Sequence, residues 1–260
     1  MKILITNDDG INAPGLKSLK KIASQLTEDP NDHWVVAPAT EQSGVGHCIS
    51  LSSPVLISKL EKQTFSIEGS PADCVLAGVH HVIKEGLPDL ILSGVNRGNN
   101  SAENALYSGT LGAAIEGALQ GILSIALSQY LGPKNVACEN PFEAAERFGP
   151  EVINKILSVD VTPKGSYHLF YNVNFPPCPA SDVKGIRFTH QGYRQDQQFS
   201  VKPVTSPSSR EFLFVAGSNQ QLQTNDGSDA AMNMDGYISI TPMTADLTAH
   251  QILKALQVGE

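Results

Sequence analysis

Two adjacent carboxylates, Asp8 and Asp9, follow a short apolar run at the N-terminus of the 260-residue chain. With nearby loop oxygens, such a pair suits a hard cation such as Mg2+ or Mn2+. Successive strand residues point to opposite faces, so both carboxylates can face one ion only where the backbone leaves strand geometry, and Gly10 permits that turn. Taken alone, Asp-Asp-Gly is more typical of a turn that caps a helix near Pro14. The pair therefore needs partners elsewhere in the chain.

A second polar segment, residues 37–47, offers a hydroxyl, two glycines and an imidazole. Ser43 could ligate a cation through its oxygen, and the backbone around Gly44 could approach a phosphate. His47 could act as a general acid, although a single loop histidine is more often solvated or structural. By itself, this segment is more typical of a flexible connector.

A third polar segment covers residues 93–100 and continues to the small-residue helix that begins near Thr110. Asn96 and Asn100 add neutral oxygen ligands or hydrogen-bond donors. The run Ser108-Gly109-Thr110 places free backbone N–H groups at a helix start, where anions such as phosphate bind. The alternative for Ser108 is a plain N-cap. The chain has neither a Walker motif nor GxGxxG after a strand, which disfavours nucleoside triphosphate motors and dinucleotide oxidoreductases.

The elements around these segments alternate between strand and helix in the first half of the chain. The expected strands are 2–6, 33–37, 55–60, 64–67, 89–93 and 122–128, and the expected helices are 15–26, 70–83 and one from about 110. The helix at 70–83 has Ser70 as N-cap and Pro71 at its first position. This alternation predicts an α/β fold with a mainly parallel sheet covered on both faces. Ligands bind beyond the carboxyl ends of such strands, and all three polar segments lie there.

The pattern loosens after about residue 130. We expect helices at 142–157 and 249–256 and strands at 168–175, 212–215 and 236–241. Residues 190–228 are rich in Gln, Ser, Pro and Asn, which indicates an irregular, protruding extension. We interpret residues 1–260 as a single domain whose core is about 1–185 and 229–260.

Composition restricts the partners and the compartment. The net charge of −8 does not attract a nucleic-acid duplex, and a phosphate-bearing substrate then needs local positive charge, which a divalent cation supplies most simply. The four cysteines form no CxxC pair, which favours free thiols in a reducing compartment. The N-terminal apolar run is too short for a signal peptide, and residues 111–131 are typical of a buried helix and strand, not of a membrane span. We expect a cytoplasmic protein without a membrane partner.

Several motifs, in order along the chain, resemble the SurE family of stationary-phase survival proteins. They are Asn7-Asp8-Asp9-Gly10, Ala37-Pro38 with Ser43-Gly44, Gly69-Ser70-Pro71-Ala72-Asp73-Cys74, Ser93-Gly94-Val95-Asn96, Tyr107-Ser108-Gly109-Thr110, Asn172-Val173-Asn174-Phe175-Pro176 and Asp235-Gly236-Tyr237-Ile238-Ser239-Ile240-Thr241-Pro242. The resemblance covers most of the chain, and the ordered set is far more specific than any one motif. It implies a 5′(3′)-nucleoside monophosphate phosphatase with a three-layer α/β/α Rossmann-like fold.

The resemblance also implies roles for individual residues. Asp8, Asp9, Ser43 and Asn96 would ligate one divalent metal, and Asn100, Ser108, Gly109 and Thr110 would line the phosphate side. The C-terminal antiparallel strands and the protruding segment would serve a homodimer or homotetramer. Ala102 and Asn104 replace the family's usual Gly and Asp, and the usual Asp-Pro-Arg-Gly and aromatic pattern is absent around residues 206–217. These departures bear on oligomer contacts and substrate preference.

The resulting hypothesis is metal-assisted hydrolysis of a phosphomonoester, in which Asp8 and Asp9 are the catalytic pair and the backbone at Gly44 adds to the phosphate side. One alternative makes an aspartate the covalent nucleophile, although the Asp-x-Asp arrangement of such enzymes is absent. Another is a nucleotide- or phosphate-sensing module without turnover. The preferred base, 3′-monophosphates and short polyphosphate all stay open, since Tyr107 and Tyr193 could equally belong to the core.

Overall fold

The computed structural model describes residues 1–27, 29–159, 167–195, 199–217, 219–222 and 224–257. Parts of the predicted core (160–166 and 258–260) and of the predicted extension (196–198, 218 and 223) lie outside the described residues. The strands are β1 (Ile3–Thr6), β2 (His33–Pro38), β3 (Ile57–Glu61), β4 (Thr64–Ile67), β5 (Leu90–Arg97), β6 (Leu123–Gln129), β7 (Phe170–Phe175), β8 (Ile186–Phe188), β9 (Ser200–Thr205), β10 (Glu211–Ala216) and β11 (Ile238–Met243). The α-helices are α1 (Pro14–Ala23), α2 (Pro71–Ala77), α3 (Gly109–Leu119), α4 (Glu143–Leu157), α5 (Asp229–Met234) and α6 (His250–Gln257). Short 3-10 helices lie at Pro30–Asp32, Ala102–Tyr107 and Ala180–Asp182.

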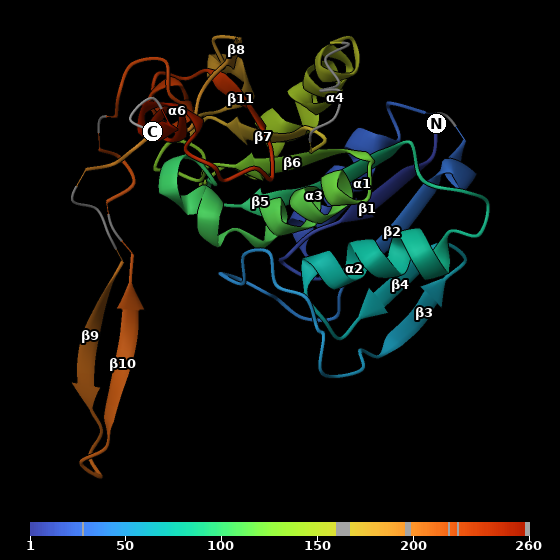
Figure 1. Cartoon of the computed structure of the whole chain (residues 1–260), viewed down its shortest axis with the longest axis horizontal. Coiled ribbons are helices and arrows are strands. Elements are labelled where there is room, and N and C mark those ends of the chain that lie inside the picture. Colours follow the sequence, from blue (N-terminus) through green and yellow to red (C-terminus); the bar gives the residue numbers. More distant parts are fainter. Residues whose placement is uncertain (28, 160–166, 196–198, 218, 223, 258–260) are drawn as a thin grey trace.

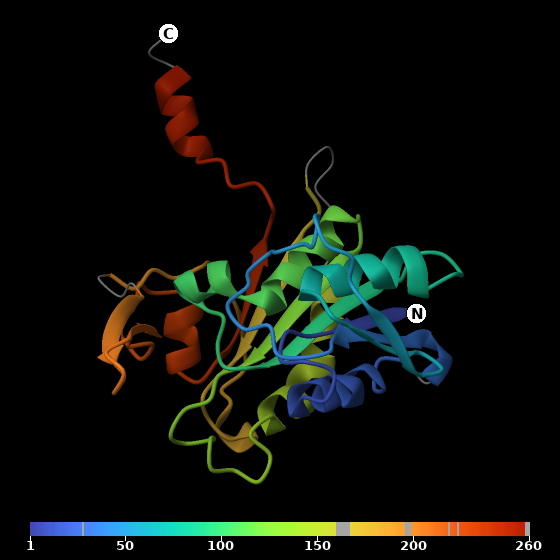
Figure 2. The ribbon, with the colours of Figure 1, turned by 90° about the horizontal axis from the view of Figure 1, so that it is seen from below.

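A nine-stranded sheet forms the centre of the molecule, in the order β3-β4-β2-β1-β5-β6-β7-β11-β8. Six neighbouring strands of this order pair in parallel, namely β4, β2, β1, β5, β6 and β7. Strand β3 pairs antiparallel with β4, and β11 pairs antiparallel with β7. Helices α1 and α4 cover one face, and α2 and α3 cover the other (Figure 1 and Figure 2). This arrangement confirms the predicted three-layer α/β/α fold with a mainly parallel sheet.

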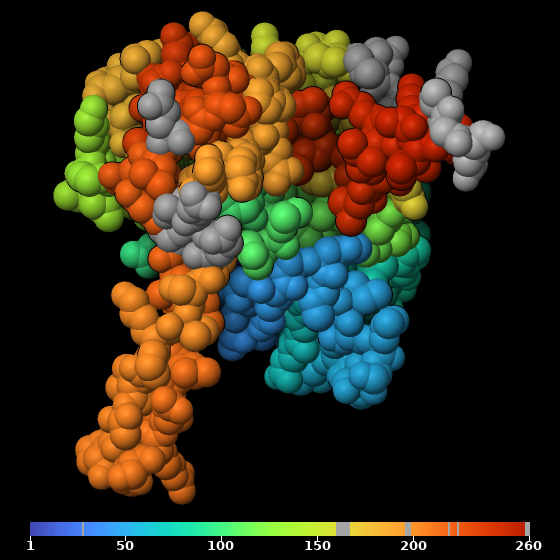
Figure 3. Space-filling model, turned by 60° about the vertical axis from the view of Figure 1, so that its left-hand side comes forward, coloured from blue at the N-terminus to red at the C-terminus, as the bar shows by residue number. Residues whose placement is uncertain are grey.

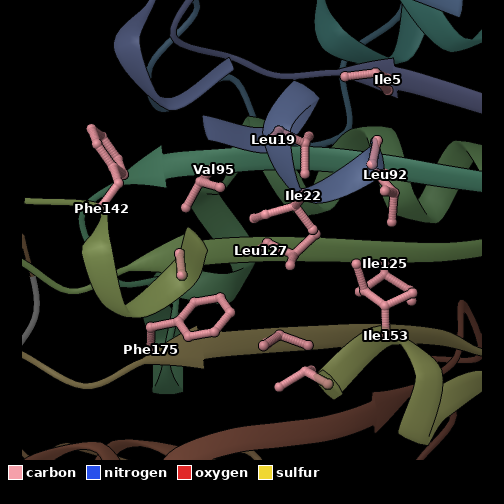
Figure 4. Packing of buried hydrophobic residues seen from close by; sticks show 14 of the residues in the cluster. Ile5, Leu19, Ile22, Leu92, Val95, Ile125, Leu127, Phe142, Ile153 and Phe175 are labelled. Atoms are coloured by element: carbon pink, nitrogen blue, oxygen red, sulfur yellow. The ribbon is translucent and has the colours of Figure 1, made fainter. Parts of the chain in front are cut away.

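Apolar residues of α1 hold the two central strands together. Ile5 of β1 and Leu92 of β5 lie in one buried cluster with Leu19 and Ile22 of α1 (Figure 4). Burial of each such side chain contributes about 1.5–3 kcal/mol. In the β1–β5 register Thr6 lies opposite Ser93. The residues that follow these two strands therefore emerge at the same edge of the sheet.

Helix α2 begins as predicted. The Ser70 hydroxyl accepts a hydrogen bond from the Asp73 N–H, the Asp73 carboxylate accepts one from the Ser70 N–H, and Pro71 occupies the first turn. These reciprocal bonds form a capping box. The single helix expected at 70–83 is divided, because α2 ends at Ala77 and a π-helical turn, Gly78–Val82, continues the chain.

Strand β5 is longer than predicted, since it ends at Arg97 and not at Ser93. Gly94 explains the difference: its φ is +135°, and a Cβ atom there would lie 2.2 Å from the Leu127 carbonyl oxygen. Only glycine lets β5 pass so close to β6 and continue. The register with β6 shifts after Ser93, and pairing resumes at Asn96. Asn96 is therefore held by a strand and not by a free loop.

The 190–228 region protrudes as predicted, but it contains a regular hairpin and is therefore less irregular than expected. Strands β9 and β10 pair antiparallel and project away from the body of the molecule (Figure 1 and Figure 3). The predicted strand at 212–215 is part of β10, whereas β9 was not predicted. The short elements α5 and β8 were also missed.

The C-terminal helix α6 also projects from the body of the molecule, in a direction different from that of the hairpin (Figure 1 and Figure 2). None of the described residues of α6 is buried. Among the described helices, none is long and apolar enough to cross a membrane.

Candidate functional site

The three polar segments meet at one cavity of about 430 Å³ beyond the carboxyl ends of β1, β2 and β5. Each segment contributes lining residues. The predicted site residues that line this cavity are Asp8, Asp9, Ser43, Gly44, Asn96, Asn100 and Ser108. We call this space the Asp8–Asp9 cavity.

A tight turn directs both aspartates into the cavity. Gly10 has a φ of +99°, and the Asn7 side-chain amide donates a 2.9 Å hydrogen bond to its carbonyl oxygen. The Asp8 carbonyl oxygen accepts a 2.7 Å bond from the Gln42 N–H, which joins the first segment to the second. The alternative that this run caps α1 is wrong. Ala13 is the N-cap of α1, and within the described residues no side chain makes a capping hydrogen bond at the start of this helix. The turn thus orients carboxylates and does not cap the helix.

Both carboxylates lie in surroundings that disfavour their negative charge. Asp8 is 5% exposed, and burial raises its pKa to about 6, although a 2.6 Å hydrogen bond from the Thr110 hydroxyl opposes the shift. Burial also raises the pKa of Asp9, and the charge of Glu41 adds to this shift, against a 3.1 Å bond from the Arg97 N–H. A cation between the two carboxylates would offset both the burial and the repulsion.

The oxygen atoms around the aspartates fit a hard divalent cation. The Asn96 side-chain nitrogen donates to the Gly98 carbonyl oxygen at 3.0 Å. The other polar atom of that side chain, Oδ1, is therefore the one that could ligate a cation. The Ser43 hydroxyl lies 2.5 Å from a carboxylate oxygen of Glu41. Among the described residues, no group of three or more His, Cys, Asp or Glu side chains could hold a metal ion. An ion here would thus depend on the hydroxyl and amide oxygens as well as on the two carboxylates.

The start of α3 packs against Asp8 instead of opening wholly into the cavity. Ser108 is the N-cap, and its hydroxyl accepts a 3.1 Å bond from the Leu111 N–H, so the N-cap alternative describes its hydroxyl correctly. Gly109 and Thr110 are not among the described lining residues. A Cβ atom on Gly109 would lie 2.9 Å from the Asp8 Cβ, and the Thr110 hydroxyl binds Asp8. In this arrangement Gly109 and Thr110 support a carboxylate.

Asn100 is fixed by polar residues of the neighbouring strands. Its N–H donates to the Asn174 side-chain oxygen at 2.7 Å, and its side-chain amide donates to the Ser128 hydroxyl at 2.8 Å. Its carbonyl oxygen accepts a 2.9 Å bond from the Asn172 side chain. The Asn172-Val173-Asn174 motif therefore positions Asn100 at the wall of the cavity.

Several lining residues had no predicted role. Of the described residues that line the cavity, Arg97 alone is basic, and Glu41 adds a third carboxylate. Arg97 and Glu41 belong to the polar segments 93–100 and 37–47, so their charged side chains could have marked them as site residues in the sequence. Tyr107 and Phe199 also line the cavity, and their rings contact edge to face at 4.9 Å. Tyr107 and Tyr193 are 48% and 68% exposed, which excludes the alternative that they belong to the core.

His47 is absent from the described lining of the Asp8–Asp9 cavity. Its Nε2 atom lies 2.8 Å from a carboxylate oxygen of Glu116, which is buried on α3. This contact ties the second polar segment to α3. The geometry favours the structural alternative for His47 over the general-acid one.

Comparisons with known proteins identify similar sequences and a similar fold. Residues 3–198 match the family described as "Survival protein SurE". Proteins named "5′-nucleotidase SurE" from Ruegeria pomeroyi and Roseobacter denitrificans are 58% and 57% identical, with 99% and 98% of each chain covered. The crystal structure of the SurE protein from Aquifex aeolicus superposes with a TM-score of 0.81 at 32% identity and covers 99% of both chains.

Proposed function

The chain belongs to the SurE family, and from this premise we propose that it hydrolyses nucleoside 5′-monophosphates to nucleoside and phosphate with one divalent cation, Mg2+ or Mn2+. It is accordingly an enzyme, a 5′-nucleotidase. The observation that carries the proposal is the convergence of Asp8, Asp9, Ser43 and Asn96 on one cavity that Asn100 and Ser108 also line.

The proposed division of labour follows from the positions of these side chains. A bound cation would neutralise phosphate charge and lower the pKa of a water molecule. Asp8 and Asp9 would hold the cation, and one of the two carboxylates accepts a proton from the attacking water. Asn100 and the backbone at Gly44 and Ser108 bind the phosphate oxygens, and Arg97 adds positive charge at the wall.

The test uses the full chain, AMP and Mn2+, with release of inorganic phosphate as the readout. We expect Asp8→Asn and Asp9→Asn each to lower kcat by about a hundredfold or more, and a chelator to abolish release. The exposed Asp226 provides a matched control, Asp226→Asn. Full activity of either site variant would contradict the proposal.

The same assay separates the alternatives. A nucleotide-sensing module binds AMP without releasing phosphate at any cation concentration. An aspartyl nucleophile yields an acid-stable phosphorylated protein on rapid quenching, whereas attack by water yields none. Adenosine 3′-monophosphate and short polyphosphate, tested with each cation, extend the panel to the wider specificity that we also propose.

We further propose that the enzyme is a single-domain, cytoplasmic homodimer or homotetramer that assembles through the β9–β10 hairpin. Phe212, Leu213, Phe214 and Val215 are each more than half exposed on this hairpin, and an isolated two-stranded hairpin is marginally stable in water. A second copy of the chain is the occupant that would cover both strands. Leu213→Asp should lower the mass measured by light scattering, whereas the exposed Ser208→Asp at the hairpin turn should not. The four cysteines are free, which fits a reducing compartment.

A further inference from the structure

The Asp8–Asp9 cavity changes character between its floor and its rim. Asp8, Asn100 and Ser108 are between 5% and 7% exposed, so the floor is buried and polar. At the rim, Tyr107 and Phe199 are 48% and 41% exposed. A ligand with one charged end and one flat apolar end matches this gradient.

The two aromatic rings are held in different ways. Tyr107 directly precedes the N-cap of α3, and its carbonyl oxygen accepts a 3.0 Å bond from the Gly46 N–H, so its backbone is tied to the second polar segment. Phe199 directly precedes β9, the first strand of the projecting hairpin. The rings meet edge to face, with 4.9 Å between centroids and 74° between planes. An edge-to-face contact covers at most one face of either ring, and both side chains stay partly exposed, so a planar ligand can still stack on them.

We propose that Tyr107 and Phe199 form the seat of the nucleobase, on which the base stacks while the phosphate lies at the floor. The proposal rests on the proposed nucleotidase function and names what that function recognises beyond the phosphate. Stacking on an aromatic ring contributes to the binding of every base, because every base has a π face.

The polar groups of the rim fit a base-tolerant seat. Asn104 and Gln220 are partly exposed and line the cavity, and the amide of the buried Asn99 donates to the Gln220 side-chain oxygen at 2.6 Å. Side-chain amides both donate and accept hydrogen bonds, so they can match the edge of a purine or a pyrimidine. The seat therefore selects nucleotides over simple sugar phosphates and discriminates weakly among bases.

The experiment compares AMP with ribose 5-phosphate, which carries the same sugar and phosphate without a base. The readout is the ratio of kcat/KM for AMP to kcat/KM for ribose 5-phosphate in the full chain with Mn2+. We expect this ratio to exceed one for the unmodified protein and to fall about 5- to 150-fold in Tyr107→Ala and in Phe199→Ala, mainly through KM for AMP. Tyr107→Phe keeps the ring and should keep the ratio.

Matched controls make the result specific. Tyr193→Ala removes an exposed tyrosine that is not among the described lining residues, and its ratio should equal that of the unmodified protein. Phe199→Ala tests the seat independently should Tyr107→Ala disturb the start of α3. Equal ratios in Phe199→Ala and the unmodified protein, or an equal loss for both compounds, would overturn the seat. Failure of the proposed nucleotidase function gives a different result, because the unmodified protein would then release phosphate from neither compound. That result would overturn the nucleobase proposal as well.

Discussion

The Thr110 hydroxyl donates a 2.6 Å hydrogen bond to Oδ1 of Asp8, and both groups are buried. The bond joins the first turn of α3 to the turn after β1, and it partly offsets the burial of the Asp8 carboxylate. A residue expected on the phosphate side thus supports Asp8, one of the two carboxylates that we propose to be catalytic.

Thr110→Val removes this hydroxyl and keeps the side-chain shape. We expect kcat/KM for AMP to fall about tenfold or more, because a charge-assisted hydrogen bond contributes roughly 1.5–3 kcal/mol and its loss misaligns Asp8. Thr110→Ser keeps the donor and should stay much closer to the unmodified protein. Phosphate release at saturating Mn2+ measures both, and equal activities of the two variants would contradict this role.

Position 109 has room only for glycine, because any side chain there would meet Asp8. A Cβ atom there would approach the Asp8 Cβ to 2.9 Å and the Gln42 carbonyl oxygen to 3.2 Å, so Gly109→Ala must displace the carboxylate or the second polar segment. We expect activity to fall at least tenfold, since a displacement of about 1 Å in an active site can cost a hundredfold in rate. Circular dichroism should show an intact fold. A fully active Gly109→Ala protein would show that the Asp8 position is not critical.

The convergence of the three polar segments was predictable because each lies at the carboxyl end of a parallel strand, and such strands end at one edge of the sheet. Asp8, Ser43 and Asn96 reach the same cavity for that reason. What each hydroxyl or amide binds was not predictable, because the Thr110–Asp8 bond spans 102 residues and depends on the packing of α3. Residue types and strand order were thus enough to predict which segments line the cavity, whereas the individual hydrogen bonds depend on tertiary packing.

The aromatic rim and the hairpin were missed for a related reason. Pro203 lies inside β9, and a proline usually argues against a strand, but a two-stranded hairpin has only edge strands, where proline is tolerated. Phe199 stands in a polar stretch without periodicity, so nothing near it in the sequence indicates Tyr107 as its neighbour. Such a pair emerges only from the tertiary fold.

The His47–Glu116 pair should couple the second polar segment to the stability of α3. Glu116 is 5% exposed, and the hydrogen bond from His47 lowers its pKa. Removal of His47 leaves the buried Glu116 carboxylate without this partner. In a double-mutant cycle of His47→Ala and Glu116→Ala at pH 7, we expect a coupling free energy of about 0.5–3 kcal/mol from chemical denaturation.

The control for this cycle pairs His47→Ala with Glu151→Ala, because Glu151 is exposed on α4. That pair should show additive effects on the free energy of unfolding. Additivity in the His47–Glu116 cycle as well would mean that the contact contributes nothing to stability.

The capping box of α2 should make stability depend on pH. Burial by itself raises the pKa of Asp73, but hydrogen bonds from the N–H groups of Ser50 and Ser70 and from the Ser50 hydroxyl outweigh it, and the net pKa is lowered. A carboxyl with a lowered pKa in the folded state stabilises the fold above its unfolded pKa of about 3.9. That contribution is lost as the pH falls through the folded pKa. Asp73→Asn should therefore lower the free energy of unfolding by about 1 kcal/mol at pH 7 and by less near pH 3, measured by urea denaturation with a chelator present. Asp226→Asn, at an exposed position, should show no such trend, and an Asp73→Asn deficit that stays constant from pH 7 to pH 3 would refute the charge-based explanation.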